Sequence, residues 1–128
     1  VIMDERFFEC QTCGNVAVMA VSSGVIPYCC GDEMKPLRAN TTDGNVEKHV
    51  PWVEIISDHR MKVKVGSMPH PMTEQHHIKF ICLETDDGYQ LKYLEFNTPA
   101  EVYLRYSGKP LAVYAYCNIH GLWKVDLK

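Results

Sequence analysis

The chain has 128 residues and a mass of 14.6 kDa, which suits one domain or one domain with a small satellite. Its formal net charge is −3 with both signs spread along the sequence, so we expect neither a nucleic-acid-binding surface nor a polybasic membrane anchor. No apolar run approaches the roughly 18 residues of a membrane span, and the first residues lack the apolar core of a secretory signal. These features predict a soluble cytoplasmic protein.

Four of the six cysteines fall in two close pairs near the start of the chain. Cys10 and Cys13 form a Cys-x-x-Cys-Gly knuckle, and Cys29 and Cys30 are adjacent and precede another glycine. In a reducing compartment such pairs predict metal ligation rather than disulfides. Four thiolates converging on one ion would form a tetrahedral site suited to iron or zinc. A structural zinc knuckle is the alternative, although zinc ribbons usually space each pair by about two residues.

Residues 1–37 are predicted to form a small unit around these cysteines. The apolar segments Val16–Val21 and Val25–Ile26 flank Ser23 and Gly24, which predicts a hairpin that folds the second cysteine pair onto the first. A unit this short could hardly fold without its metal. The polar, turn-forming residues 40–45 that follow predict a linker.

Residues 38–128 are predicted to form a second unit built from strands. Short alternating stretches divided by turn signals, without a helical period, favour an antiparallel β-sandwich. Cys82 lies inside one of these stretches, between two aliphatic residues, which is typical of a buried core thiol. The predicted strands cover residues 52–56, 61–65, 76–84, 89–96, 101–106, 111–116 and 122–127.

Several histidines and one further cysteine fall in loops or at strand ends of this second unit, where ligands are easily presented. His76 and His77 would point to opposite faces of a strand, so at most one of them can bind a given metal. We choose His76, although periodicity alone does not decide between them. His59 lies in a charged turn and is expected to be solvated. The candidate ligands are His49, His70, His76, Cys117 and His120.

If these five residues share one ion, the donor set indicates which metal it is. Five strong donors leave one position of an octahedron open, which suits iron better than zinc or blue copper. Neutral imidazoles and one thiolate would leave a ferrous ion with a formal charge of about +1. An anion would be drawn to this site, and Lys48 beside His49 would add to the attraction.

Two alternatives remain open at this point. One is a cupredoxin-like electron carrier, in which Cys117, His120 and one upstream histidine hold copper. The other is a structural or interaction module with zinc at the four cysteines and the histidines on the surface.

Together these motifs resemble the superoxide reductases of the desulfoferrodoxin type, and the resemblance covers essentially the whole chain. In that pattern the second histidine of the middle motif lies six residues after the first, which supports His76, whereas His77 stands where an aromatic is usual. The resemblance rests on Cys10-x-x-Cys13 with Cys29-Cys30, on Glu47-Lys48-His49-Val50-Pro51, on His70-Pro71-Met72 with His76, and on Cys117-Asn118-Ile119-His120-Gly121.

The resemblance implies an all-β protein with two iron ions per chain. A desulforedoxin-like domain over residues 1–37 would precede an immunoglobulin-like catalytic β-sandwich over residues 38–128. The first iron would be held by Cys10, Cys13, Cys29 and Cys30, and the catalytic iron by His49, His70, His76 and His120 in a plane with Cys117 axial.

The resemblance also implies an activity and partners. The enzyme would reduce superoxide by one electron to hydrogen peroxide without releasing dioxygen, using a rubredoxin-like electron donor, and it would form a homodimer. Glu47 would occupy the sixth iron position in the resting ferric state and leave on reduction. Lys48 is our candidate for steering the anion and for organising the water that delivers a proton.

Overall fold

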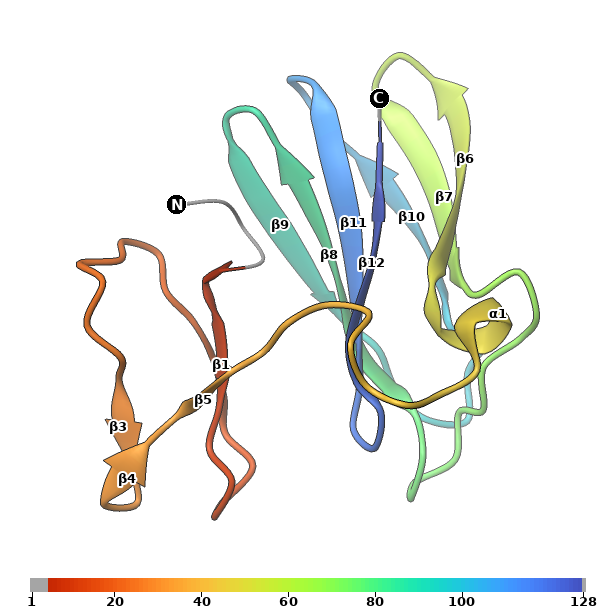
Figure 1. Cartoon of the computed structure of the whole chain (residues 1–128). Coiled ribbons are helices and arrows are strands. Elements are labelled where there is room, and N and C mark those ends of the chain that lie inside the picture. The colour runs from red at the N-terminus through yellow and green to blue at the C-terminus, as the bar shows by residue number, and fades with distance from the viewer. Residues whose placement is uncertain (1–4, 128) are drawn as a thin grey trace. The chain divides into compact units, whose positions relative to one another are not determined.

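The computed structural model describes residues 5–127, and its regular structure is almost entirely β-strand, as Figure 1 shows. By internal packing the chain divides into two compact units, residues 1–38 and 39–128. Each unit has its own apolar core. The all-β fold expected from the sequence is therefore confirmed. Among the described residues, no helix is long and apolar enough to cross a membrane.

The N-terminal unit contains two very small antiparallel sheets. The first has the strand order β2-β1-β5 and the second pairs β3 with β4. The core beneath them is correspondingly small and centres on Phe8, Cys10 and Met34. The strands are β1 (Phe7–Glu9), β2 (Val16–Val18), β3 (Tyr28–Cys29), β4 (Asp32–Glu33) and β5 (Lys35–Pro36).

The hairpin predicted for this unit is wrong. β2 pairs with β1, and Val25–Ile26 is not part of any strand. Burial explains the difference, because Phe8 on β1 is 8% exposed and packs with Ala17 of β2 in the core of this unit, whereas Val25 is 72% exposed. Pairing with the aromatic strand buries more apolar surface than the predicted hairpin would. Cys29 is instead carried by the β3–β4 hairpin.

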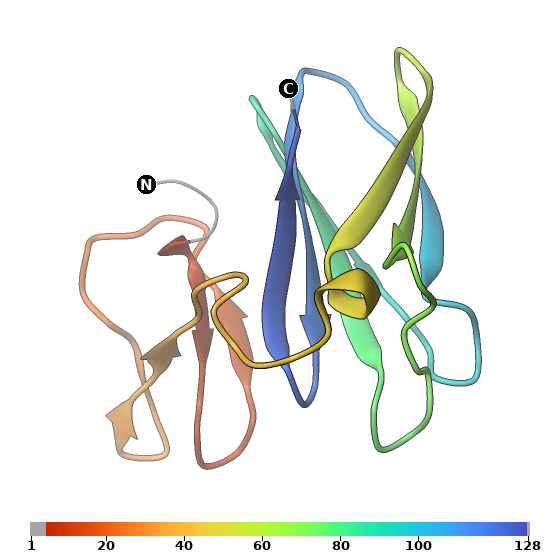
Figure 2. The ribbon, with the colours of Figure 1, turned by 45° about the vertical axis from the view of Figure 1, so that its right-hand side comes forward.

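The second unit consists of two antiparallel sheets that face each other, which Figures 1 and 2 show from two directions. One sheet has the order β10-β7-β6 and the other β12-β11-β8-β9. One short helix, α1 (Val46–His49), precedes the first strand, and the sequence analysis missed it. The strands are β6 (Pro51–Ser57), β7 (Arg60–Val65), β8 (Ile78–Thr85), β9 (Gly88–Tyr93), β10 (Glu101–Arg105), β11 (Pro110–Cys117) and β12 (Gly121–Asp126).

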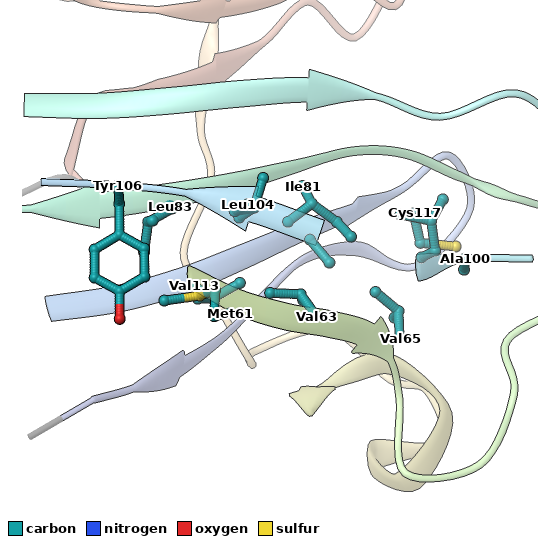
Figure 3. Close-up of a cluster of buried hydrophobic side chains, with 12 residues drawn as sticks. Met61, Val63, Val65, Ile81, Leu83, Ala100, Leu104, Tyr106, Val113 and Cys117 are labelled. Carbon is teal, nitrogen blue, oxygen red and sulfur yellow. The ribbon is translucent and has the colours of Figure 1, made fainter. Parts of the chain in front are cut away.

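The core of this unit lies between the two sheets (Figure 3). Along β7, Met61, Val63 and Val65 are buried, while Lys62 and Lys64 alternate with them and are half-buried on the other face. This period of two is what the sequence pattern predicted for a strand with one face on the core. Residues of the other strands complete the cluster, including Ile81, Leu83, Leu104, Val113 and Cys117.

A glycine fixes the position of α1 against the loop that follows β7. A Cβ atom at Gly66 would lie 2.5 Å from the carbonyl oxygen of Glu47 and 2.8 Å from that of Val50. Only a residue without a side chain allows this approach. The amide of Met68 then donates a hydrogen bond of 3.0 Å to the Glu47 carbonyl. The helix that ends at His49 is thus held to the sandwich by backbone contacts.

Candidate metal centres

The four cysteines of the N-terminal unit form the first candidate centre. Their sulfur atoms all lie within 4.8 Å of one another, and Cys13 Sγ and Cys29 Sγ are 3.6 Å apart. All four thiols are free, so no disulfide competes with metal binding. Two turns with positive φ, Gly14 at 83° and Cys30 at 54°, bring the chain back toward the sulfurs.

The electrostatics of this group favour a bound cation. The backbone N–H of Cys13 lies 3.4 Å from the Cys10 sulfur and is the main cause that lowers the pKa of Cys10 to about 6. The neighbouring thiols, Cys13 first, raise the pKa of Cys30 to about 12. Without an ion, the four sulfurs cannot all ionise together. A cation removes this obstacle, and a set of four thiolates fits iron or zinc.

The second candidate centre collects its donors from four places in the β-sandwich. His49 is the last residue of α1, and His70 and His76 lie in the connection between β7 and β8. Cys117 ends β11, and His120 lies in the turn before β12. One donor atom from each of these five residues lies within 4.8 Å of the others.

Hydrogen bonds show which imidazole nitrogen of each histidine faces the group. His49 Nδ1 donates to the carbonyl oxygen of Asn45 at 2.7 Å, and His70 Nδ1 donates to that of Pro71 at 2.6 Å. Both rings therefore present Nε2 to the centre, and these two Nε2 atoms are 3.1 Å apart. His120 instead presents Nδ1, which lies 3.0 Å from His49 Nε2.

His76 carries an observation that favours a bound atom at the centre. Its Nε2 atom is buried and has no hydrogen-bond partner in the described chain. A buried polar nitrogen without a partner is costly, and a bound metal ion would satisfy it. The residues present therefore fit a metal, and a set of four imidazoles and one thiolate fits iron.

Burial prepares the histidines to bind a metal at neutral pH. It lowers the pKa of His49, His70 and His76, and that of His70 falls to about 4. These imidazoles are thus neutral and can use their lone pairs as ligands. Burial raises the pKa of Cys117, against the effect of the His120 N–H that lies 3.4 Å from its sulfur. Metal binding at this site must therefore release the thiol proton.

Two residues that the sequence analysis missed shape one side of this centre. Trp123 stacks on His49 with ring centroids 4.8 Å apart, and its Nε1 donates to the carbonyl oxygen of His120 at 3.0 Å. Gly44 fits against the same rings, since a Cβ there would lie 3.1 Å from Trp123 Cζ2 and 3.4 Å from His120 Cγ. The only signal in the sequence was the tryptophan three residues after His120.

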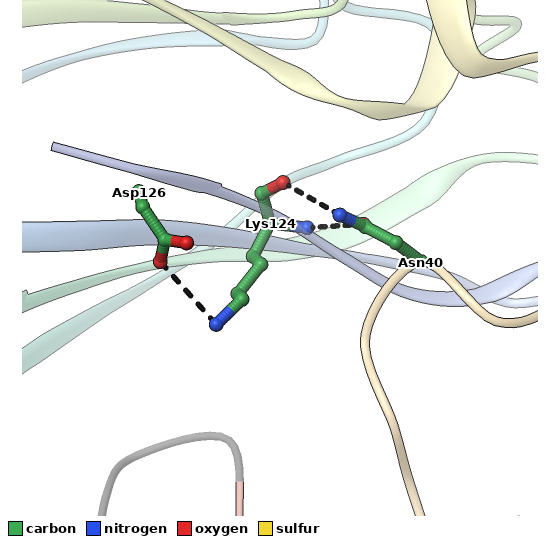
Figure 4. Close-up of polar contacts among 3 residues, drawn as sticks. All are labelled: Asn40, Lys124 and Asp126. Atoms are coloured by element: carbon green, nitrogen blue, oxygen red, sulfur yellow. Dashed lines mark hydrogen bonds and ion pairs between the residues drawn. The ribbon is translucent and has the colours of Figure 1, made fainter.

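Residues 40–45, which we predicted to be a linker, are part of the sandwich unit. The side-chain amide of Asn40 donates to the Lys124 carbonyl at 3.1 Å and accepts from the Lys124 amide at 2.8 Å (Figure 4). Asn45 caps α1 by accepting a hydrogen bond from the Lys48 amide at 3.2 Å. Their polar composition reflects caps and turns rather than a free connection.

The remaining candidate residues lie outside the five-donor group. Glu47 is exposed and Lys48 is half-buried, both on α1. His77 turns away from the donors, and its ring centroid lies 5.7 Å from that of Phe96. His59 is exposed and Cys82 is fully buried. The copper alternative uses two imidazoles, whereas four converge here.

The fold and the two donor groups define a class of β-sandwich proteins that carry a five-donor metal centre and a separate four-thiolate centre. A sequence profile of the desulfoferrodoxin family matches residues 41–126. The chain is 41% identical to the desulfoferrodoxin of Desulfarculus baarsii, over 97% of this chain and 99% of that protein. It therefore belongs to the desulfoferrodoxin family, as the sequence motifs predicted.

Further relatives agree with this assignment. The desulfoferrodoxin homolog of Archaeoglobus fulgidus is 37% identical over 93% of this chain and 94% of that protein. The crystal structure of the superoxide reductase from Treponema pallidum superimposes with a TM-score of 0.78 at 35% identity, covering 94% of this chain and 98% of that one. The family and its two-centre composition are consistent with iron at both groups.

Proposed function

We propose that this chain is a superoxide reductase. Superoxide would take one electron from a reduced donor protein, together with two protons, and leave as hydrogen peroxide without release of dioxygen. The observation that carries the proposal is the convergence of four imidazoles and one thiol in a member of the desulfoferrodoxin family. The solved relative from Treponema pallidum is itself a superoxide reductase.

Iron held by His49, His70, His76, His120 and Cys117 would supply one-electron chemistry by cycling between its ferrous and ferric forms. The protein sets the conditions for this cycle. Carbonyl oxygens at Asn45 and Pro71 fix two of the rings, so the donors need little rearrangement between redox states. Four neutral imidazoles and one thiolate leave the occupied site positively charged, which attracts an anionic substrate.

Lys48 and Glu47 are the residues on α1 proposed to act beside this centre. The ammonium group of Lys48, half-buried next to His49, would attract superoxide and hold the water that supplies a proton. The exposed carboxylate of Glu47 would bind in the resting ferric state and leave on reduction. Both roles rest on the family resemblance and on the position of α1.

The N-terminal group Cys10, Cys13, Cys29 and Cys30 is proposed to hold the second iron. Four thiolates complete a tetrahedron and leave no place for a substrate, so we assign this centre to electron relay or to support of the small domain. A domain boundary near residue 38 would separate it from the catalytic domain. We further propose a rubredoxin-like electron donor, a homodimer, and a reducing compartment such as the cytoplasm, where these thiols stay free.

The experiment that tests this function measures iron per chain together with the visible spectrum, as purified and after ascorbate. About two irons per chain are expected, with a thiolate–iron spectrum from the first group and a second band that appears only on oxidation. Adding superoxide to the ascorbate-reduced protein should generate that second band. Zinc or copper in place of the second iron, with no activity after reconstitution with Fe²⁺, would contradict the proposal.

A further inference from the structure

Asn118 links two segments that each carry donors of the second centre. It directly follows Cys117, and its side-chain Nδ2 donates to the carbonyl oxygen of Gln75 at 2.9 Å. Its Oδ1 accepts a hydrogen bond from the amide of His77 at 2.9 Å, and its own backbone N–H donates to the His77 carbonyl at 3.2 Å. These three bonds bracket His76, which lies between the two bonded residues.

Backbone pairing makes only one of these three bonds. Along β11, Tyr116 pairs with Phe80 but Cys117 pairs with Ile78, so the register shifts at the last position. Strand β8 begins at Ile78, and the residues before it are outside the sheet. The side-chain amide of Asn118 therefore takes the place of the next peptide group and continues the hydrogen bonding past the end of the strand.

His76, which is half-buried, depends on this connection more than the buried ligands His49 and His70 do. The rings of His49 and His70 are each fixed by a hydrogen bond from Nδ1 to a carbonyl oxygen. The described chain gives the ring of His76 no hydrogen bond, and its buried Nε2 lacks a partner. Ring contacts with His70 and His120, at centroid distances of 4.7 and 5.0 Å, act on the ring directly, and its direction otherwise depends on its backbone. Asn118 holds that backbone on one side and Thr73 on the other, through a 3.0 Å bond from the His76 amide to Thr73 Oγ1.

We propose that Asn118 is a positioning residue that fixes the separation between His76 and the turn carrying Cys117 and His120. The inference rests on the proposed function, because it concerns the iron that these residues would bind. With Asn118 in place, the His76 ring is already aimed at the centre before the metal arrives. Without it, metal binding must also order the segment from Gln75 to His77, which lowers the affinity.

The test compares Fe²⁺ binding by the wild-type chain and by Asn118→Ala, with the four-cysteine centre already loaded. Affinity is measured by competition with a chelator, and the thiolate–iron band of the oxidised protein is recorded for each variant. We expect Asn118→Ala to bind Fe²⁺ about 10-fold more weakly, because substitution of residues that support metal ligands typically costs that much affinity. The absorption band of the oxidised protein should also shift. Asn118→Ser, a milder change that can keep one polar contact, should fall between the two.

Asn40→Ala is the matched control. Asn40 uses the same two side-chain atoms to bond the backbone of Lys124 (Figure 4), but it belongs to no donor segment. Its φ of 63° adds a strain cost for alanine, so the control should lose at least as much folding stability as Asn118→Ala. We nevertheless expect its Fe²⁺ affinity and its band to match the wild type.

The outcomes separate this inference from the proposed function. Wild-type affinity and an unshifted band in Asn118→Ala, in a protein that still reduces superoxide, would overturn the positioning role alone. An equal loss of affinity in Asn40→Ala would assign the effect to general stability and would overturn it as well. If the wild-type chain takes up no Fe²⁺ at the five donors, both proposals fail.

Discussion

The two donor groups of this chain are built on very different amounts of protein. The four cysteines belong to a unit whose strands have only two or three residues, and Cys29 alone of the four lies on a strand. The core of this unit centres on Phe8, Cys10 and Met34, and two of the four cysteines are exposed. The five donors of the sandwich lie at the end of a core shared by two sheets, and three of them are buried. We therefore expect the first group to depend on its metal for its structure, and the second to be assembled by the fold.

The protonation of the two groups differs in the same way. Neighbouring thiols raise the pKa of Cys30, so the first group needs a cation before all its sulfurs can ionise. Burial lowers the pKa of His49, His70 and His76, so these three imidazoles are ready to bind a metal, whereas burial raises the pKa of Cys117, which must lose a proton. A saturated, metal-dependent centre suits support or electron relay, and a preassembled centre with an open position suits chemistry.

Removal of both metals should produce the largest difference between the two units. We expect the N-terminal unit to lose its structure, because metal binding in such small units contributes on the order of 10 kcal/mol to folding. The sandwich should stay folded on its own core. Amide chemical-shift dispersion of the metal-free protein, read separately for residues 5–38 and 39–127, measures this. Simultaneous unfolding of both units would contradict the comparison.

Cysteine substitutions in the two groups should differ in their effect on activity. Cys117→Ser removes a proposed ligand, so superoxide reduction should fall by more than the roughly 100-fold that loss of a ligand's partner can cost. Cys13→Ser should retain the reaction with superoxide, because its centre holds no substrate. Rapid mixing of each reduced variant with superoxide measures both rates. A folded but inactive Cys13→Ser variant would show that the reaction with superoxide requires the first centre.

Lys48→Ile should slow superoxide capture by about 10-fold at low ionic strength, since a focused positive charge raises encounter rates by at least that factor. The rate should also depend less on salt, because screening weakens only the attraction that remains. Lys109→Ile, an exposed lysine in the turn before β11, makes the same change in net charge and should leave the rate unaltered. Equal slowing in both variants would show that the net charge of the protein, and not the position of Lys48, causes the effect.

Glu47→Ala tests the neighbouring position on α1. The band of the oxidised protein should shift, because a proposed ligand of the ferric state is lost, while superoxide capture by the reduced protein should stay nearly constant. Absorption spectra and stopped-flow rates measure the two properties. An unshifted band would count against ligation by Glu47.

Cys82 belongs to neither donor group, and its substitution should have a smaller effect, on the pH dependence of stability. Burial raises its pKa from 9.0 to about 12, so the stability that it contributes is complete below pH 9 and is lost as the pH rises toward 12. Between pH 9 and pH 10 the wild-type chain should lose about 1 kcal/mol more unfolding free energy than Cys82→Ala. Urea unfolding at the two pH values measures the difference, and parallel losses would show that Cys82 ionises freely.

Local pattern predicted much of the sandwich and little of the N-terminal unit. The alternation of Met61, Val63 and Val65 with lysines identified β7, because one face of that strand rests on the core. In the N-terminal unit the strands are too short for such a pattern, and burial of Phe8 in the core of the unit favoured the pairing instead. The helix α1 has only four residues, which is too short for a helical period to show in the sequence.

The candidate donors could be chosen from the sequence because histidine and cysteine are rare and their motifs are specific. Their supporting residues could not. Asn118 bonds Gln75 across 43 positions, and Trp123 stacks on His49 from the opposite end of the unit's sequence. The first contact depends on the register between β8 and β11, which shifts beside Cys117, and the second joins β12 to α1. No local rule for asparagine or tryptophan contains that information.

The stoichiometry of the reaction tests the central claim most directly. The iron-loaded chain, kept reduced by a donor, is supplied with a known amount of superoxide, and hydrogen peroxide and dioxygen are both measured. A reductase forms one peroxide for each superoxide consumed, takes one electron from the donor each time, and releases no dioxygen. Formation of one peroxide and one dioxygen from every two superoxide ions would show dismutation, and would contradict the account.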